Sequence, residues 1–208
     1  MDHKLTEIEV RVLGALIEKE ITTPDYYPMS LNALVAACNQ SSNRHPILHL
    51  DESTVADAAD SLRERKLVHR VDRGESRVVK YRHVLYEAMN WGRPVIAVMC
   101  VLMLRGPQTV GEIRTRSGRL YDFTSLDEVE LTLNSLMTGD SPLITRLPRQ
   151  SGQKEVRYSH LLSGEVSFTP AEAEAEAESV PELSRIEKLE KDVEDLKRQF
   201  EEFRKQFE

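Results

Sequence analysis

Residues 67–83, LVHRVDRGESRVVKYRH, recur at residues 143–160 as LITRLPRQSGQKEVRYSH. In each copy, two short runs that contain β-branched and aromatic residues flank a polar segment, which predicts a β-hairpin. A helical pattern precedes each copy and places a valine and a leucine seven residues apart; the pairs are Val55 with Leu62 and Val129 with Leu136. The chain therefore carries the same supersecondary pattern twice.

Three helices are predicted before each hairpin. Polar residues that cap helix N-termini stand before the apolar runs, and these are Thr6, Ser30, Asp51, Thr109 and Ser125. Glu128 follows Ser125 by three residues, so this helix start predicts a capping box. The run 95–104 is apolar throughout. It is too short to span a bilayer and predicts a buried helix that ends at Gly106-Pro107.

Three helices and a hairpin within about 75–80 residues match the plan of a winged helix, a helix-turn-helix with a β-ribbon appended. The sequence therefore predicts a mainly α protein with small β-hairpins, built from two tandem winged-helix domains and a C-terminal coiled-coil helix. The predicted boundaries are 1–90 and 91–165 for the two winged-helix domains, 166–182 for an acidic Ala/Glu linker, and 183–208 for the coiled coil.

The predicted coiled coil rests on a heptad repeat. Its apolar positions alternate strictly three and four residues apart, and they are Ile186, Leu189, Val193, Leu196, Phe200, Phe203 and Phe207. About three heptads are marginal as an isolated helix, so the apolar stripe calls for a partner. We predict a homodimer through this helix; packing of the helix against the rest of the chain is the alternative.

The net charge of −7 is concentrated in the tail. From Pro170 to the end there are 13 acidic and 7 basic residues, which leaves 22 acidic and 21 basic residues for the rest. A nearly neutral body lacks the strong basic character that favours nucleic-acid partners. Cys38 and Cys100 each stand in an apolar run, and no signal peptide precedes them, so a cytoplasmic protein with reduced thiols and no membrane association is expected.

The predicted third helices argue against base readout in the major groove. Their first turns carry Asp51 and Glu52 in one copy and Asp127 and Glu128 in the other, whereas base edges are read mainly by arginine, lysine, asparagine and glutamine. Candidate nucleic-acid contacts lie instead on the hairpins and on the polar connection after residue 38; they are Asn39, Gln40, Asn43, Arg44, Arg70, Arg73, Arg77, Lys80, Arg146, Arg149 and Lys154. The alternative is a solvated hairpin and an internally bonded loop.

Four stretches are distinctive: EKEITTPDYYP at 18–28, ACNQSSNR at 37–44, LRGPQT at 104–109 and SGEV at 163–166. With these strings the chain resembles the bacterial YceH family over its full length. The resemblance implies a tandem winged-helix protein. It implies no catalytic residue, no metal and no ligand.

The sequence also lacks the motifs of common enzyme classes, with no P-loop, no Gly-x-Ser-x-Gly and no His-Glu-x-x-His. We expect no catalysis, no cofactor, no metal and no small-molecule substrate. The expected function is a non-enzymatic, dimeric binding or regulatory module. Two kinds of partner stay open at this point: DNA, bound through the basic hairpins and the polar connection, and another protein, bound through the acidic third helices.

Overall fold

The computed structural model describes residues 4–71, 78–139, 141–149 and 155–164, and all of them belong to one compact unit. The predicted linker and coiled coil lie outside the described residues, as do the predicted contact residues Arg73, Arg77 and Lys154. The predicted boundary between residues 90 and 91 falls inside this unit.

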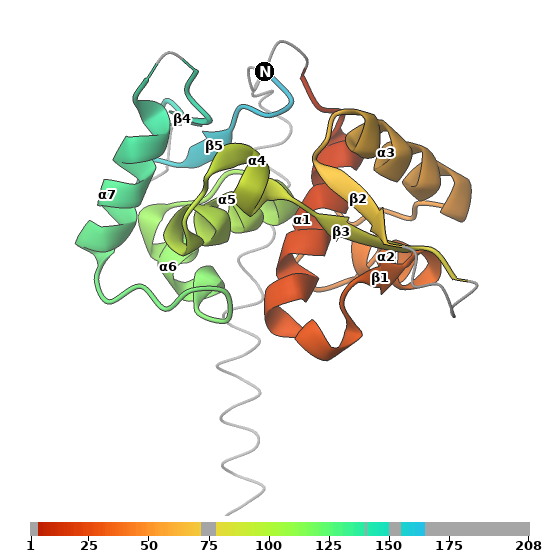
Figure 1. Ribbon diagram of the computed structural model, residues 1–208. Helices are drawn as coiled ribbons and strands as arrows, with labels where there is room; N and C mark the ends of the chain where they lie inside the picture. The colour runs from red at the N-terminus through yellow and green to blue at the C-terminus, as the bar shows by residue number, and fades with distance from the viewer. Residues whose placement is uncertain (1–3, 72–77, 140, 150–154, 165–208) are drawn as a thin grey trace, which may run out of the picture. The chain divides into compact units, whose positions relative to one another are not determined.

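The described part of the chain is mainly helical, with seven α-helices and two small antiparallel sheets (Figure 1). In chain order the elements are α1 (Glu7–Thr22), the 3-10 helix η1 (Pro24–Tyr26), β1 (Met29–Ser30), α2 (Leu31–Cys38), α3 (Glu52–Glu64), β2 (Val68–Val71), β3 (Lys80–His83), α4 (Leu85–Met89), α5 (Arg93–Arg105), α6 (Val110–Ser117), α7 (Leu126–Met137), β4 (Ile144–Arg146) and β5 (Tyr158–His160). Among these helices none has both the length and the apolarity to cross a membrane.

Five of the helices begin at the predicted N-caps. The capping side chains are Thr6 for α1, Ser30 for α2, Asp51 for α3, Thr109 for α6 and Ser125 for α7, and each accepts a hydrogen bond from the backbone N–H three residues on. Full capping boxes form at Thr6 and Thr109. The capping box predicted at Ser125 is wrong. The Glu128 carboxylate accepts from the backbone N and Oγ1 of Thr124 and from the Tyr121 hydroxyl instead, because the preceding loop brings these donors within reach.

The two sheets use the duplicated hairpin in the same way. In the first sheet the strand order is β1-β3-β2, with Met29 and Arg70 both opposite Tyr81. In the second, β4 pairs with β5, and Gln108 forms an isolated bridge to Tyr158 through two backbone hydrogen bonds of 3.0 and 2.8 Å. Gln108 therefore takes the place that Met29 has in the first sheet. The sequence did not predict β1, because two residues leave no detectable period.

A continuous core joins the two copies of the pattern. Residues 96–104 of α5 are all buried, as predicted, and α5 packs against α1. A Cβ atom added at Gly14 of α1 would lie 2.9 Å from Leu104 Cδ2 and 3.3 Å from Met103 Cβ. Glycine thus permits the close approach of the two helices. The predicted stop of α5 is also confirmed: Gly106 caps it with φ 69° and ψ −152°, which essentially only glycine adopts.

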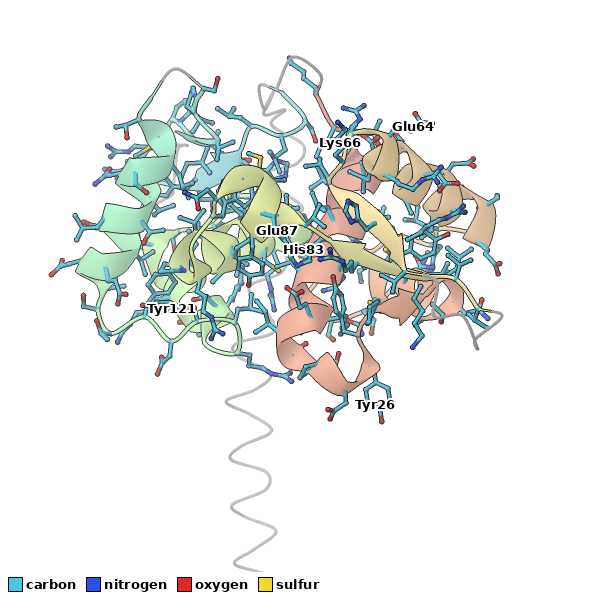
Figure 2. The ribbon with its side chains drawn as sticks, in the orientation of Figure 1. Tyr26, Glu64, Lys66, His83, Glu87 and Tyr121 are labelled. Atoms are coloured by element: carbon cyan, nitrogen blue, oxygen red, sulfur yellow. The ribbon has the colours of Figure 1, made fainter. Side chains whose placement is uncertain are left out.

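His83 ends β3 and holds the first sheet against α1 (Figure 2). Its Nε2 lies 2.8 Å from Glu20 Oε2, and its Nδ1 accepts a hydrogen bond from the backbone N of Leu85. The backbone N of His83 donates to the Tyr27 hydroxyl at 2.7 Å. His160 ends β5 at the equivalent position, and burial lowers its pKa to about 4, so it is neutral at physiological pH. Both histidines are part of the packing at a strand end.

Candidate functional site

Four of the predicted contact residues lie in the connection between α2 and α3, and Arg44 is the most buried of them. Its side chain has no exposed surface. Nε donates to the carbonyl of Ala37 at 3.0 Å, and the two terminal nitrogens donate to the Glu18 carboxylate at 3.1 and 2.7 Å. Burial raises the pKa of Glu18, but the hydrogen bonds and the charge of Arg44 outweigh it and leave the pKa lowered. The guanidinium of Arg44 therefore makes its hydrogen bonds inside the protein and is not available to an external ligand.

The amide side chains of this connection are bonded internally as well. Asn39 donates to the carbonyl of Leu50 at 2.7 Å and accepts from its N–H at 2.8 Å. Gln40 Oε1 accepts from Lys19 Nζ at 3.3 Å and from Arg44 at 3.1 Å. The Asn43 side-chain oxygen accepts from Arg105. The polar loop thus matches the alternative interpretation, in which its side chains fix one helix against another.

A second buried arginine, Arg11, was not singled out in the sequence. It is 3% exposed and donates to the carbonyl of Cys38 at 3.0 Å and to that of Pro46 at 2.6 Å. Together with the bond from Arg44 to Ala37, it satisfies carbonyls at the C-terminal end of α2, where the helix dipole favours positive charge. An arginine within the otherwise apolar stretch 10–17 is the signal that could have revealed it.

The basic side chains on the two hairpins are mostly engaged with the rest of the chain. Arg70 lies 3.4 Å from Asp60 and stacks over the Tyr81 ring at 5.8 Å. Arg157 donates to the Pro107 carbonyl and to Glu112 at 2.9 and 3.0 Å. Lys80 is half-buried, whereas Arg146 and Arg149 are exposed. The predicted contact residues in the described part of the chain therefore do not gather into one surface of uncommitted cations.

The third helices of both copies present acidic outer faces. On α3 the exposed residues include Glu52, Asp57 and Glu64, and the only basic residue of the helix is Arg63. On α7 the exposed residues Leu126, Asp127, Glu130, Leu131, Asn134 and Ser135 form what we call the α7 face, and the helix contains no lysine or arginine. The carboxylates expected at these positions are thus exposed.

Two leucines distinguish the α7 face. Leu131 is 70% exposed and Leu126 is 46% exposed, whereas Val129, Leu133 and Leu136 face the core. Leu131 falls outside the helical spacing of the core positions, so its exposure could have been predicted from the sequence. Large exposed apolar side chains beside carboxylates form a surface that can bury area against another macromolecule.

Neither thiol is suited to nucleophilic chemistry. Cys38 and Cys100 are unpaired and buried, as predicted. Burial raises the pKa of Cys38 to about 12 and also raises the pKa of Cys100, so both are protonated at physiological pH. No group of three histidine, cysteine, aspartate or glutamate side chains within the described ranges is arranged to hold a metal ion.

Fold and surfaces together define a mainly helical protein with two small antiparallel sheets and a partly apolar, acidic outer helix. Comparison with known proteins places it further: residues 5–153 match the family model described as a protein of unknown function, DUF480, and the chain belongs to that family. It is similar to a UPF0502 protein of Opitutus terrae, with 53% identity over 91% of this chain and 81% of the relative. Identity to the UPF0502 proteins of Solibacter usitatus and Geotalea uraniireducens is 52% and 48%, over the full length of both chains.

Proposed function

We propose that the described unit consists of two tandem winged-helix units, α1 to β3 and α5 to β5, and that the protein is a non-enzymatic, protein-binding module. The same order of three helices and two strands occurs in both halves. The bridging residues support the duplication further. Met29 and Gln108 each precede the N-cap of the second helix, and each pairs with the tyrosine of the last strand.

In this arrangement α3 and α7 occupy the place of the helix that enters the major groove in DNA-binding relatives of the fold. Asp57 and Glu64 on α3 and Asp127 and Glu130 on α7 would then lie beside phosphates. Carboxylates in that position repel the DNA backbone, which supplies most of the affinity of such complexes. The acidic outer helices therefore favour a protein partner over a duplex.

The observation that carries the proposal is the exposure of Leu131 on the α7 face. Full burial of a leucine side chain contributes about 1.5–3 kcal/mol, so Leu131 can supply a substantial part of the binding energy at the centre of an interface. The neighbouring carboxylates of Asp127 and Glu130 favour a partner that carries positive charge around the pocket that receives Leu131. The expected partner surface is an apolar socket rimmed by lysine or arginine.

Site-specific photo-crosslinking tests this surface. A benzoylphenylalanine placed at the exposed Asn134 lies one helical turn from Leu131. On irradiation in cells we expect a discrete protein adduct, and we expect Leu131→Asp to abolish it because a carboxylate cannot enter an apolar socket. Tyr26→Asp is the matched control, because it removes a side chain that is 80% exposed elsewhere and adds the same charge (Figure 2).

The crosslinked protein is then purified and titrated calorimetrically against the wild type and the two variants. Binding that is lost with Leu131→Asp and kept with Tyr26→Asp supports the proposal. Fluorescence anisotropy with mixed duplexes at about 50 mM salt provides the opposing test. Tight duplex binding that falls with Arg70→Ala and Arg146→Ala would overturn protein binding in favour of DNA.

Dimerisation through the predicted heptad is a separate proposal on residues outside the described part. Deletion from Ser179 onward removes all seven apolar heptad positions. We expect sedimentation analysis to show a dimer for the full chain and a monomer for the truncated chain, with an unchanged circular dichroism signal per residue from the remaining body. If the truncated chain also sediments as a dimer, the heptad is not the dimer contact.

A further inference from the structure

A cleft of about 130 Å³ opens where α1, α5 and α6 end, next to the connection between α2 and α3. Four basic residues line it: Lys19 from α1, Arg105 from α5, and Arg116 and Arg119 at the end of α6. Among the described residues, the only acidic one in its lining is Glu18, which is already paired with the buried Arg44. Residues 1–169 contain 22 acidic and 21 basic residues, so the cleft concentrates positive charge within a nearly neutral body.

Nearby acceptors engage three of the four cations, and two of these acceptors are carboxylates. Lys19 Nζ lies 3.2 Å from Glu18 and 3.3 Å from the Gln40 amide oxygen. Arg116 contacts Glu112 at 3.4 Å and donates to the Gln108 amide oxygen. Arg105 donates to Asn43. The other three acceptors, Gln40, Asn43 and Gln108, are neutral amides, so they orient the cations without offsetting their charge.

Arg119 completes the set from the position after α6. It is exposed, and within the described residues it makes no hydrogen bond or ion pair. An exposed guanidinium at the rim of a concavity can turn inward onto a bound anion, and its fork geometry suits the oxygens of a phosphate group. Arg119 is therefore the lining cation whose guanidinium is available to bind a ligand.

The helix C-termini offset only part of the positive charge of the cleft. Lys19, Arg105 and Arg116 stand in the last turns of their helices, where cations offset the dipole. Each helix C-terminus carries roughly half a negative charge. With Arg44 and Glu112, which pair with lining residues, five cations stand against two carboxylates, and three such helix ends offset about half of this surplus of three positive charges. A positive potential remains, and concave walls focus it.

Three further lining residues are apolar, and we call them the apolar wall of the cleft: Val101 and Leu104 from α5 and Leu120 after α6. Its volume equals that of about four water molecules, which is enough for a phosphate group with the first atoms of an organic substituent. A duplex does not fit a space of this size. The combination of guanidinium groups and an apolar wall selects a small organic phosphate in preference to a bare anion.

We propose that this cleft is a binding site for a small phosphomonoester. Arg116 and Arg119 hold the phosphate oxygens, Lys19 and Arg105 add positive potential, and the apolar wall contacts the organic part of the ligand. The site is independent of the α7 face and of the protein partner proposed for it. It lies where α1 meets α5, so an occupied cleft adds a tie between the two copies of the repeated pattern.

Calorimetric titration of the full chain with phenyl phosphate, alongside inorganic phosphate, tests the site. We expect phenyl phosphate to bind more tightly than inorganic phosphate, because only the ester uses the apolar wall. Arg119→Gln and Arg116→Gln should each weaken phenyl phosphate binding at least about tenfold, the usual loss for a charge-assisted hydrogen bond. Binding should strengthen as the pH rises through about 6, where the phosphate gains its second charge.

Arg114→Gln is the matched control, since it removes the same charge from the same helix but outside the cleft lining. Its binding should equal that of the wild type, and thermal unfolding of Arg119→Gln should match the wild type because its side chain is exposed. No heat of binding at millimolar phenyl phosphate would overturn the proposal. So would equal affinity for the two phosphates, or an equal loss with Arg114→Gln.

Discussion

Arg44→Met is expected to lower the free energy of unfolding by about 3–5 kcal/mol, the cost of breaking a buried ion pair by removing one partner. The substitution leaves the Glu18 carboxylate, whose side chain is 13% exposed, without its bidentate partner. It also removes the donor for the Ala37 carbonyl at the end of α2. Methionine retains much of the volume, so the loss reports on charge and hydrogen bonding more than on a cavity.

Urea denaturation followed by circular dichroism measures this loss. The matched control is Arg63→Met on α3, where the arginine is 44% exposed and lies 3.6 Å from Asp60; its removal should change the stability by less than about 1 kcal/mol. The double variant Arg44→Met with Glu18→Gln should recover part of the loss, because no buried charge is left unpaired. If Arg44→Met costs no more than Arg63→Met, the buried pair does not stabilise the fold.

The same ion pair should appear in the pH dependence of stability. The pKa of Glu18 is lowered in the folded protein from an ordinary value of 4.5. A carboxyl whose folded pKa is lowered contributes stability that is present above its unfolded pKa and is lost as the pH falls through its folded pKa. Below pH 4.5, therefore, the wild type should lose stability more steeply than Glu18→Gln. Parallel curves for the two proteins would contradict this assignment.

Gly14→Leu is the second substitution with a large expected effect. Any Cβ at this position meets Leu104 Cδ2 at 2.9 Å and Met103 Cβ at 3.3 Å, so a leucine forces α1 away from α5. We expect a loss of about 2–3 kcal/mol from overpacking, even though leucine is a better helix former than glycine by up to about 1 kcal/mol. Thermal and urea unfolding of the full chain measure the change.

Gly111→Leu on α6 is the matched control. Its added Cβ meets only Thr109 Oγ1 at 4.0 Å, and residue 111 is exposed. There the gain in helix propensity acts alone, and we expect unchanged or slightly raised stability. Opposite signs for the two leucine substitutions would support the close packing of α1 on α5. A loss of the same size at both positions would mean that the contact between the helices is not the cause.

Much of the local structure could be predicted from the sequence. Thr6, Ser30 and Asp51 were identified as N-caps because a short polar side chain before an amphipathic run competes for the first free N–H groups of a helix. The buried α5 followed from its unbroken apolar run, and the two hairpins followed from their repeated strings. Each of these features depends on residues a few positions apart.

The functional side chains were harder to predict. Asn39 and Arg44 have the composition of nucleic-acid contacts, yet both are bonded within the protein. The cleft was not predicted at all, since Lys19, Arg105 and Arg119 come from distant positions and look like ordinary helix-end cations in the sequence. In the sequence, the exposure of Leu131 was indicated only by its position, which falls outside the helical spacing of the buried residues of α7.

Six of the seven described helices, the N-caps of five of them and the duplicated pattern could be predicted from the sequence, because these are decided by neighbours along the chain. Tertiary structure alone decided that Arg44 lies against Glu18, 26 positions away, and that α1 and α5 share one core. The reason is that a charged side chain has no fixed preference for water or interior. Its place depends on whether packing brings a carboxylate and free carbonyls to it, and residues adjacent in sequence do not reveal that.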